Sequence, residues 1–324
     1  MEKLLCGVDL GGTNLSAGLV RSDGGTLVDD ICTHDHVHKD EDGIINNIAY
    51  LVNALLEKNG LEEDDLLGIG VVFPGHIRFS DGVSITTSNL TASFKNYPFR
   101  QSIQKHFRKA TVYVDNDANA QAYAEYKYGA GRGYNSIIFV TISTGIGAGI
   151  IVDGKLMRGI TGTAGEVGHV IINPNSKRKC TCGNYGCLMT QACGLFLPDI
   201  AIDKIKSGIG NKLGITLDNV RDKVNGLTMK NGLDIKDELS TAVVFESADS
   251  IAIALYNLFQ LFNPPIIVLG GGLVNWGNIY MERINQRFHS LAKDMLFDEM
   301  KIVTSEIGKN AGIIGASSLP LEHL

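Results

Sequence analysis

The sequence has few of the features that mark membrane, secreted or nucleic-acid-binding proteins. Its 324 residues include 7 Pro and 1 Trp, and 29 Lys and Arg against 35 Asp and Glu give a net charge of -6 without a long basic run. This balance does not favour nucleic acid as a partner. No segment has the roughly 18 uninterrupted apolar residues of a membrane helix, and no secretory signal is recognisable. We therefore expect a cytoplasmic protein without a membrane partner.

Glycine, by contrast, is abundant. The 38 glycines do not gather in a low-complexity linker, so they are expected at particular turns, where the missing Cβ permits close approach. The chain is also longer than a single hydrophobic core usually holds, and 44% of its residues are hydrophobic. Length and composition therefore favour two core units built around specific turns.

Strands and helices alternate along the chain, which predicts an α/β architecture. A strand at 4–8, a glycine turn and a strand at 16–21 are followed later by a strand at 137–142, a second glycine turn and a strand at 148–152. This recurrence predicts a duplicated hairpin unit, one copy in each of two lobes. Further strands are expected at 67–73, 111–114 and 266–269, helices at 44–56, 118–126 and about 248–261, and no assignment is made for 202–237.

Two glycine-rich turns are candidates for phosphate binding. Successive backbone N–H groups in such a turn form a concave anion site. Each turn alone also fits a simple tight turn, but their recurrence favours phosphate. Neither follows the Walker pattern, and the glycines at 270–272 lack the full dinucleotide pattern while still admitting a flat ligand such as adenine. The turns read Asp9-Leu-Gly11-Gly12-Thr13 and Thr141-Ile-Ser-Thr144-Gly145-Ile-Gly147-Ala-Gly149.

A polar segment, Asp115-Asn-Asp-Ala-Asn119, begins a predicted helix directly after a strand. One Asp or Asn at such a position is usually a helix N-cap. Four polar residues of five are more than capping requires. A carboxylate at a strand end can accept the proton of a substrate hydroxyl while its neighbour holds another hydroxyl.

Three of the six cysteines are clustered in Cys180-Thr-Cys182-Gly-Asn-Tyr-Gly-Cys187, and Glu166-Val-Gly-His169 places an imidazole nearby. Three Cys and one His are the composition of a closed, structural zinc site. Free buried thiols are the alternative. The cluster therefore predicts zinc in a structural role.

The remaining cysteines and a histidine cluster have no predicted site. An extended segment carries three imidazoles on one face, which we interpret as a solvated strand end rather than a metal site. The residues concerned are Cys6, Cys32, Cys193, His34, His36 and His38.

Together these motifs resemble the ROK family of bacterial sugar kinases and sugar-responsive repressors. The resemblance covers essentially the whole chain and is most specific at Glu166-x-x-His169 with the C-x-C-G-x-x-G-C run of 180–187. It implies a duplicated actin-like, ribonuclease-H-like ATPase fold with two lobes around an ATP and sugar cleft. The small lobe would comprise 1–116 and about 301–324, and the large lobe 117–300 with the zinc loop. The resemblance also implies a homodimer.

The same resemblance implies roles for the site residues. Asp117 would be the catalytic base that accepts the proton of the C6 hydroxyl of a hexose, while Mg²⁺ neutralises the phosphates of ATP. Zinc would fix the loop that carries His169. The implied sets are Gly75, Asn89, Asn116, Asp117, Glu166 and His169 for the sugar, Asp9, Gly11, Gly12, Thr13, Thr144, Gly145, Gly147, Gly270 and Gly271 for ATP, and His169, Cys180, Cys182 and Cys187 for zinc.

One departure from the family pattern bears on the substrate. The family has Glu two residues after the last cysteine, where this chain has Met189. A thioether cannot replace a charge-assisted acceptor, so the preferred sugar is expected to differ from glucose at C1 or C2. Met189 also motivates a second hypothesis, a catalytically weak sugar-binding or regulatory protein. A DNA-binding repressor would need an N-terminal winged-helix domain, for which the residues before Asp9 leave no room.

Overall fold

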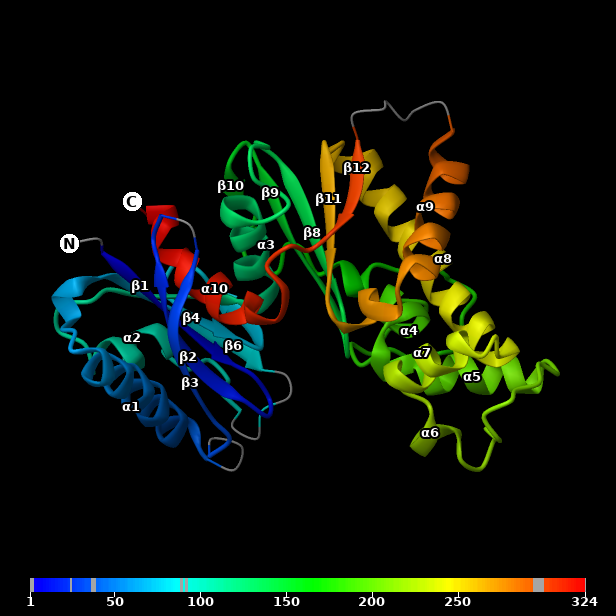
Figure 1. Cartoon of the computed structure of the whole chain (residues 1–324), viewed down its shortest axis with the longest axis horizontal. Coiled ribbons are helices and arrows are strands. Elements are labelled where there is room, and N and C mark those ends of the chain that lie inside the picture. Colours follow the sequence, from blue (N-terminus) through cyan, green and yellow to red (C-terminus); the bar gives the residue numbers. More distant parts are fainter. Residues whose placement is uncertain are drawn as a thin grey trace. The chain divides into compact units, whose positions relative to one another are not determined.

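The chain folds into alternating strands and helices. A computed structural model describes residues 3–23, 25–35, 39–87, 90, 93–293 and 300–323. Within these residues the strands form two five-stranded sheets and one two-stranded sheet, and helices lie along the sheets (Figure 1). The predicted α/β class is confirmed.

The first five-stranded sheet has the order β3-β2-β1-β4-β7. β1, β2 and β3 are consecutive and antiparallel, whereas β4 runs parallel to β1 and β7 runs parallel to β4. The carboxyl ends of β1, β4 and β7 therefore meet at one edge, where ligands bind in open α/β sheets. The bounds are β1 Leu4–Leu10, β2 Leu15–Arg21, β3 Leu27–Thr33, β4 Leu66–Phe73 and β7 Val112–Asn116.

Helices cover both faces of this sheet (Figure 1). Successive strand residues point to opposite faces, so Cys6 of β1 packs in one core with Ile48 of α1, while Leu5 packs in another with Ile313 of α10. α3 lies against α10, and α2 contacts α1 and β7. The helix bounds are α1 Glu41–Asn59, α2 Phe99–Gln104, α3 Asp117–Tyr128 and α10 Ala311–Ser318.

Two glycines on neighbouring strands let α10 lie close to the sheet. Gly7 of β1 pairs with Gly70 of β4. A Cβ at Gly7 would lie 2.1 Å from the carbonyl oxygen of Ile313, and a Cβ at Gly70 would lie 1.8 Å from that of Ala316. The helix backbone therefore occupies the space that side chains would take, which fixes its position against β1 and β4.

The second five-stranded sheet has the order β10-β9-β8-β11-β12, and β5 pairs with β6 in the two-stranded sheet. β8 and β9 form the second predicted hairpin with its glycine turn, and β11 and β12 are parallel. The bounds are β5 Gly75–Arg78, β6 Val83–Thr87, β8 Ile137–Ile142, β9 Ile146–Val152, β10 Lys155–Leu156, β11 Ile266–Gly270 and β12 Lys301–Thr304.

The chain divides into two compact units. The first comprises Met1–Phe139, Gly149–Gly165 and Ser305–Leu324, and the second comprises Val140–Ala148 and Glu166–Thr304. The predicted lobes divide the chain at other residues and remain a prediction. Ser305–Leu324 belongs to the first unit because α10 packs on its sheet.

A long helix, α8, is the centre of the helical part of the second unit. It packs against α4, α5, α7 and α9, and its N-cap Asp237 accepts a hydrogen bond from Ser240 N. It begins at Glu238, well before the predicted start near 248. The segment left unassigned contains α6 and α7. The bounds are α4 Leu188–Ala192, α5 Leu197–Lys206, α6 Val220–Lys223, α7 Gly226–Asp234, α8 Glu238–Phe262 and α9 Asn278–Ala292.

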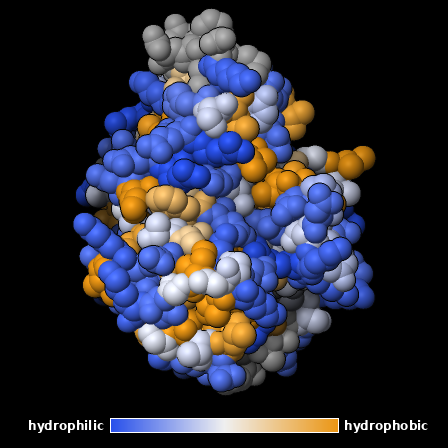
Figure 2. All heavy atoms as spheres, turned by 90° about the vertical axis from the view of Figure 1, so that its right-hand side faces the viewer, coloured by the Kyte–Doolittle hydropathy of each residue, from blue (hydrophilic) through white to orange (hydrophobic). Residues whose placement is uncertain are grey.

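By length and apolar composition α8 meets the requirements of a membrane span, contrary to the expectation that no segment does. However, 61% of its apolar window is buried inside the protein. A core helix of a soluble protein passes the same test, so this is weak evidence for a membrane segment. The face shown in Figure 2 is mostly hydrophilic, and its hydrophobic side chains form small, separate patches.

Candidate active site

The first glycine turn connects β1 to β2. Gly11 N donates to Asn14 O at 2.8 Å and closes the turn. Gly11 and Gly12 are half-buried, and Thr13 is exposed. The predicted phosphate contacts therefore lie together in a tight turn that remains open on one side to solvent.

Asp9 precedes this turn and lies near Asp117. Burial, and then the charge of Asp117, raise the pKa of Asp9 to about 6. The first turn of α10 packs directly on the Asp9 carboxylate, because a Cβ at Gly312 would lie 1.9 Å from Asp9 Oδ2. The structure thus brings two predicted site residues together in one unit. It also concentrates negative charge where a divalent cation would be stabilising.

The polar segment at the end of β7 is ordered by its own hydrogen bonds. Asn116 is the N-cap of α3, and its Oδ1 accepts from Asn119 N at 2.9 Å. Asp117 Oδ1 accepts from Ala118 N at 2.9 Å. Asp115 Oδ1 accepts from Asn116 N at 2.7 Å and from Asn119 Nδ2 at 2.9 Å. The capping interpretation is therefore correct for Asn116, and the same bonds hold the Asp117 carboxylate at the helix start.

Two further sugar contacts were predicted in the first unit. Gly75 begins β5, directly after β4, and a Cβ there would lie 2.2 Å from Thr86 O. Pairing of β5 with β6 is therefore sufficient to require glycine at this position. Asn89 lies outside the described residues.

The second glycine turn connects β8 to β9. Ser143 N donates to Gly145 O at 2.8 Å, and Leu195 N donates to Thr144 O at 3.0 Å. Thr144 is exposed, and Gly145 and Gly147 are half-buried. This turn, like the first, places successive backbone groups at a bend between antiparallel strands.

The end of β11 lies beside the second turn. Gly271, directly after Gly270, has φ 92°, in the region that favours glycine. A Cβ at Gly271 would lie 2.4 Å from Ile142 O, and one at Gly272 would lie 3.7 Å from Ser143 Oγ. The structure therefore brings the predicted adenosine contacts next to the predicted phosphate contacts of the second unit.

The four predicted zinc ligands come together in the second unit. Their donor atoms all lie within 4.8 Å of one another. Cys182 Sγ and Cys187 Sγ are 3.7 Å apart, close to the distance of about 3.8 Å that tetrahedral Zn–S bonds of about 2.3 Å produce. Cys180 Sγ lies 3.5 Å from His169 Nδ1, and His169 Nε2 lies 4.0 Å from Glu166 Oε2. One ring nitrogen thus points to the thiols and the other to Glu166.

Met189 lies at the start of α4 and touches both neighbouring loops. Its Sδ accepts a hydrogen bond from Ile146 N at 3.1 Å. A Cβ at Gly145 would lie 3.7 Å from this sulfur, and one at Gly168 would lie 3.2 Å from it. Met189 therefore fills the space between the second glycine turn and the segment that joins Glu166 to His169.

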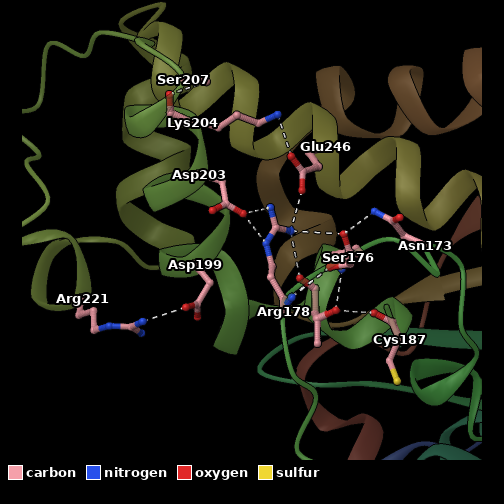
Figure 3. A network of polar contacts seen from close by, with 12 residues as sticks. Asn173, Ser176, Arg178, Cys187, Asp199, Asp203, Lys204, Ser207, Arg221 and Glu246 are labelled. Carbon is pink, nitrogen blue, oxygen red and sulfur yellow. Dashed lines mark hydrogen bonds and ion pairs between the residues drawn. The ribbon is translucent and has the colours of Figure 1, made fainter. Parts of the chain in front are cut away.

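Arg178 anchors the cysteine loop to three helices of the second unit (Figure 3). Its guanidinium binds Asp203 of α5 at 2.8 Å and Glu246 of α8 at 2.7 Å. It also donates to the carbonyl of Thr190 in α4 at 3.2 Å, and Thr190 Oγ1 donates to Cys187 O at 2.8 Å. The loop that carries the thiols is thus held by one mostly buried charge.

Sequence reasoning missed Gly312. Asp9 and Gly312 lie at opposite ends of the chain, and no local motif connects them. The only available signal is the run of small residues at 311–318, which indicates a helix packed closely against its neighbours.

The residues without a predicted site have ordinary surroundings. Cys6 and Cys193 are buried, and burial raises the pKa of both thiols. His34 Nδ1 donates to Thr13 O at 3.0 Å, so this imidazole supports the first glycine turn. His36 and His38 lie outside the described residues.

Comparisons with known proteins decide the family. The family model "ROK family" matches residues 5–323. The chain belongs to the ROK family. A glucokinase from Halalkalibacterium halodurans is 32% identical, covering 98% of this chain and 95% of that protein. A xylose repressor from Caldicellulosiruptor bescii is 28% identical, covering 89% of this chain and 71% of that protein.

Solved structures of ROK proteins share the fold. The ROK hexokinase from Thermus thermophilus superposes with a TM-score of 0.82 at 26% identity, over 99% of both chains. A ROK glucokinase from Streptomyces griseus in complex with glucose and AMPPNP gives a TM-score of 0.76 at 26% identity, over 98% of this chain and 99% of that one. The ROK chain therefore has the actin-like, ribonuclease-H-like ATPase fold that its motifs predict.

Proposed function

We propose that this ROK protein is an ATP-dependent kinase that transfers the γ-phosphoryl group of ATP to the C6 hydroxyl of a hexose. The observation that carries the proposal is the pair of carboxylates, Asp9 and Asp117, at the carboxyl ends of β1 and β7 beside the first glycine turn. The comparisons support a sugar kinase at the coarser level.

In phosphoryl transfer the protein contributes positioning of the reactants and electrostatic stabilisation rather than covalent chemistry. Asp117 would accept the proton of the attacking hydroxyl, because its carboxylate is oriented at the start of α3 by Ala118 N. Asn116 would hold a neighbouring sugar hydroxyl. The backbone N–H groups of Gly11, Gly12 and Thr13 would bind phosphate oxygens.

The acidic residues of the first unit fit a magnesium ion. Mg²⁺ prefers carboxylate and phosphate oxygens. Burial and the nearby charge of Asp117 make ionisation of the Asp9 carboxyl group costly, and a bound cation would offset that cost. Asp9 would therefore hold Mg²⁺ together with the phosphates of ATP. When bound, the ion would neutralise charge on the transferred phosphoryl group.

The second unit would contribute the remaining contacts. Its glycine turn, with Thr144, Gly145 and Gly147, would bind phosphate. Gly270 and Gly271 would lie along adenosine, since glycine leaves room for a flat ring system there. The sugar would meet Glu166 and His169, whose Nε2 is turned towards Glu166.

Zinc is proposed for the Cys and His cluster, in a structural role because three thiolates and one imidazole fill a tetrahedral ion. Removing the ion with a strong chelator should release about one zinc per chain and lower the melting temperature, since metal binding is coupled to folding. Metal analysis of the purified protein is the direct measurement. A preparation with full activity and no zinc would contradict this assignment.

Met189 bears on which sugar is used. Its sulfur is already bonded to Ile146 N and packed against Gly145 and Gly168, so this position offers no carboxylate to a sugar hydroxyl. An unpaired buried hydroxyl costs about 1–3 kcal/mol. We therefore propose a hexose altered at C1 or C2 relative to glucose, such as an epimer, a deoxysugar or a glycoside.

A coupled assay of ADP release tests the function over glucose, mannose, allose, fructose, amino sugars and β-glucosides. Asp117→Asn should lower kcat by about 100- to 10,000-fold, the usual contribution of a general base, while sugar binding persists. Full turnover by Asp117→Asn would remove the proposed role of this residue.

A regulatory sugar-binding protein is the second candidate. The 28% identity to a xylose repressor and the presence of Met189 favour it. Calorimetry would then show tight binding of one sugar from the panel, while saturating MgATP gives no ADP release. Measurable turnover of the sugar that binds most tightly would reject this candidate.

A further inference from the structure

Arg158 lies in the interior of the first unit, two residues after β10, and its side chain is only 9% exposed. Its Nε donates to Asp115 Oδ2 at 2.7 Å, and its Nη1 donates to Glu322 Oε1 at 2.8 Å. Nη2 also pairs with Glu322 Oε2, and the guanidinium stacks over the ring of Phe79 at 3.7 Å. Each of the three guanidinium nitrogens therefore donates to a carboxylate, which compensates for the burial of the charge.

The contact with Asp115 reaches the proposed catalytic residues through one carboxylate. Asp115 Oδ2 accepts the hydrogen bond from Arg158 Nε, while Asp115 Oδ1 accepts from Asn116 N and from Asn119 Nδ2. The two oxygens therefore tie Arg158 to the last residue of β7 and the first turn of α3. Asp117 follows directly, so the orientation of Asp115 fixes the direction in which the chain turns from strand into helix.

Glu322 adds a second fixed point from the end of the chain. It lies in the last 3-10 turn, Leu319–His323. The ring of His323 stacks on Tyr113 of β7 at 4.7 Å and on Phe79 at 5.8 Å. The C-terminal turn therefore lies against β7 and completes the enclosure of the arginine.

The backbone at Arg158 is fixed as well. Ala164 N donates to Arg158 O at 3.1 Å, which closes the loop that follows. A Cβ at Gly162 would lie 2.1 Å from Ile77 O, so the loop also lies directly on β5. Glu166 comes two residues after the closing bond. Arg158 therefore begins the loop that precedes Glu166, and its side chain bonds through Asp115 to the strand that ends at Asn116.

We infer that Arg158 is a positioning residue for phosphoryl transfer, which acts through Asp115 to hold Asn116 and Asp117 in their working orientation, with Glu322 as its second anchor. The inference rests on the proposed kinase function. Because Asp115, Glu322 and Phe79 enclose its guanidinium, we assign Arg158 no contact with substrate or reacting atoms. Small displacements of a catalytic group can lower a rate by about 100-fold, so the effect should appear mainly in kcat.

Kinetics of substituted chains test this role. Arg158→Met should lower kcat by about 100-fold and raise KM for the sugar by a smaller factor, because Asp115 also orients Asn116. Arg158→Lys keeps the charge but cannot reach both carboxylates, so it should recover part of the rate. Glu322→Gln leaves the bond to Asp115 in place and should have the smallest effect.

Arg78 provides the matched control. It also pairs with a carboxylate, Asp81, but that pair is about half exposed on the surface of the same unit. Arg78→Met should therefore retain the kcat and KM of the unsubstituted chain. If Arg158→Met does not fold, the comparison of Arg158→Lys with Arg78→Lys decides.

The outcomes separate the inference from the proposed function. A folded Arg158 variant with kcat within twofold of the original overturns the inference, as does an equal effect of Arg78→Met. No ADP release from the unsubstituted chain over the whole sugar panel rejects the kinase function instead. Amide hydrogen exchange at Ala118 and Asn119 then decides the ordering role: at least tenfold faster exchange in Arg158→Lys supports it, and unchanged exchange overturns it.

Discussion

At the scale of single residues, α10 and Asp9 make a very close contact at the candidate site, which leaves no room for a side chain at Gly312. Gly312 has no φ requirement, so its backbone conformation alone would accept alanine. The conflict is spatial, because the new Cβ would enter the Asp9 carboxylate. The helix and the carboxylate therefore depend on each other for their positions.

Gly312→Ala should lower kcat/KM for MgATP at least tenfold, because Asp9 must move away from the phosphate turn. Alanine is intrinsically better than glycine in a helix by about 1 kcal/mol, so a loss cannot be ascribed to helix propensity. Gly210→Ala is the control, since a Cβ there meets nothing within 4 Å. Equal steady-state kinetics for the two variants would contradict the contact as a functional constraint.

Asp9 also predicts a pH dependence of stability. Its pKa is about 6 in the folded chain against 3.8 for the ordinary group. The folded chain therefore binds more protons between these values, and stability that is fully present below about pH 4 is lost as pH rises to about 6. Asp9→Asn should flatten the curve by on the order of 3 kcal/mol. Urea unfolding between pH 4 and 7 measures it, and parallel curves for both chains would contradict it.

Candidate residues in local motifs could be proposed from the sequence, whereas contacts between distant parts of the chain could not. The glycine turns, Asn116, Asp117 and the four predicted zinc ligands each lie within a short sequence pattern that indicates a chemical role. Arg158 finds its partners at Asp115 and Glu322, and no sequence pattern joins these three. Only packing brings them together.

At the scale of elements, the cysteine loop depends on an ion pair rather than on regular structure. Its segment between His169 and Cys187 has isolated bridges but no long strand or helix. Arg178 supplies the missing anchorage, and its side chain is 13% exposed. Its partners are less buried, since the side chain of Glu246 is 23% and that of Asp203 55% exposed, so removing Arg178 costs its charge-assisted hydrogen bonds rather than a fully buried ion pair.

Arg178→Gln should lower the free energy of unfolding by roughly 1–2 kcal/mol, because hydrogen bonds to Thr190 and to partly solvated carboxylates are lost. It should also speed the chelator-dependent loss of metal, because the thiols would be less well ordered. Arg221→Gln is the matched control: Arg221 pairs with Asp199 nearby but is 66% exposed (Figure 3). Chemical denaturation and metal-release kinetics measure the two effects. Equal behaviour of both variants would show that the network does not hold the loop.

Strong periodicity decided which elements could be predicted. The apolar stripe of α1 and the apolar strands β4, β8 and β11 were found because burial determines their sequences. The first ten residues of α8 were missed, since Ser240 and Ser247 are buried there and interrupt the apolar pattern. α6 and α7 are short and carry few buried residues, which leaves little periodicity to detect.

At the scale of the whole molecule, the first unit needs the end of the chain. α10 packs on β1, β2, β4 and α3, and it fills the space above Gly7 and Gly70. A chain that ends at Thr304 would expose the apolar side chains of this face, which include Leu5 and Val20.

A chain ending at Thr304 should therefore lose the cooperative thermal unfolding of the first unit. A synthetic peptide of residues 305–323 added in trans should restore part of it. Circular dichroism with intact and truncated chains is the measurement. Cooperative unfolding of the truncated chain at the original temperature would contradict a structural need for α10.

The two units also differ in how they are distributed along the chain. All but nine residues of the second unit, Val140–Ala148, form one uninterrupted stretch, Glu166–Thr304. A single recombination segment would therefore carry Glu166, the cysteine loop, Met189 and the β11 glycines together, and would leave Asp9, Asn116 and Asp117 with the recipient. The residues proposed for zinc and for adenosine, together with Met189, would thus be exchanged between related genes in one event, while the proposed catalytic base and its neighbours in the first unit would descend separately.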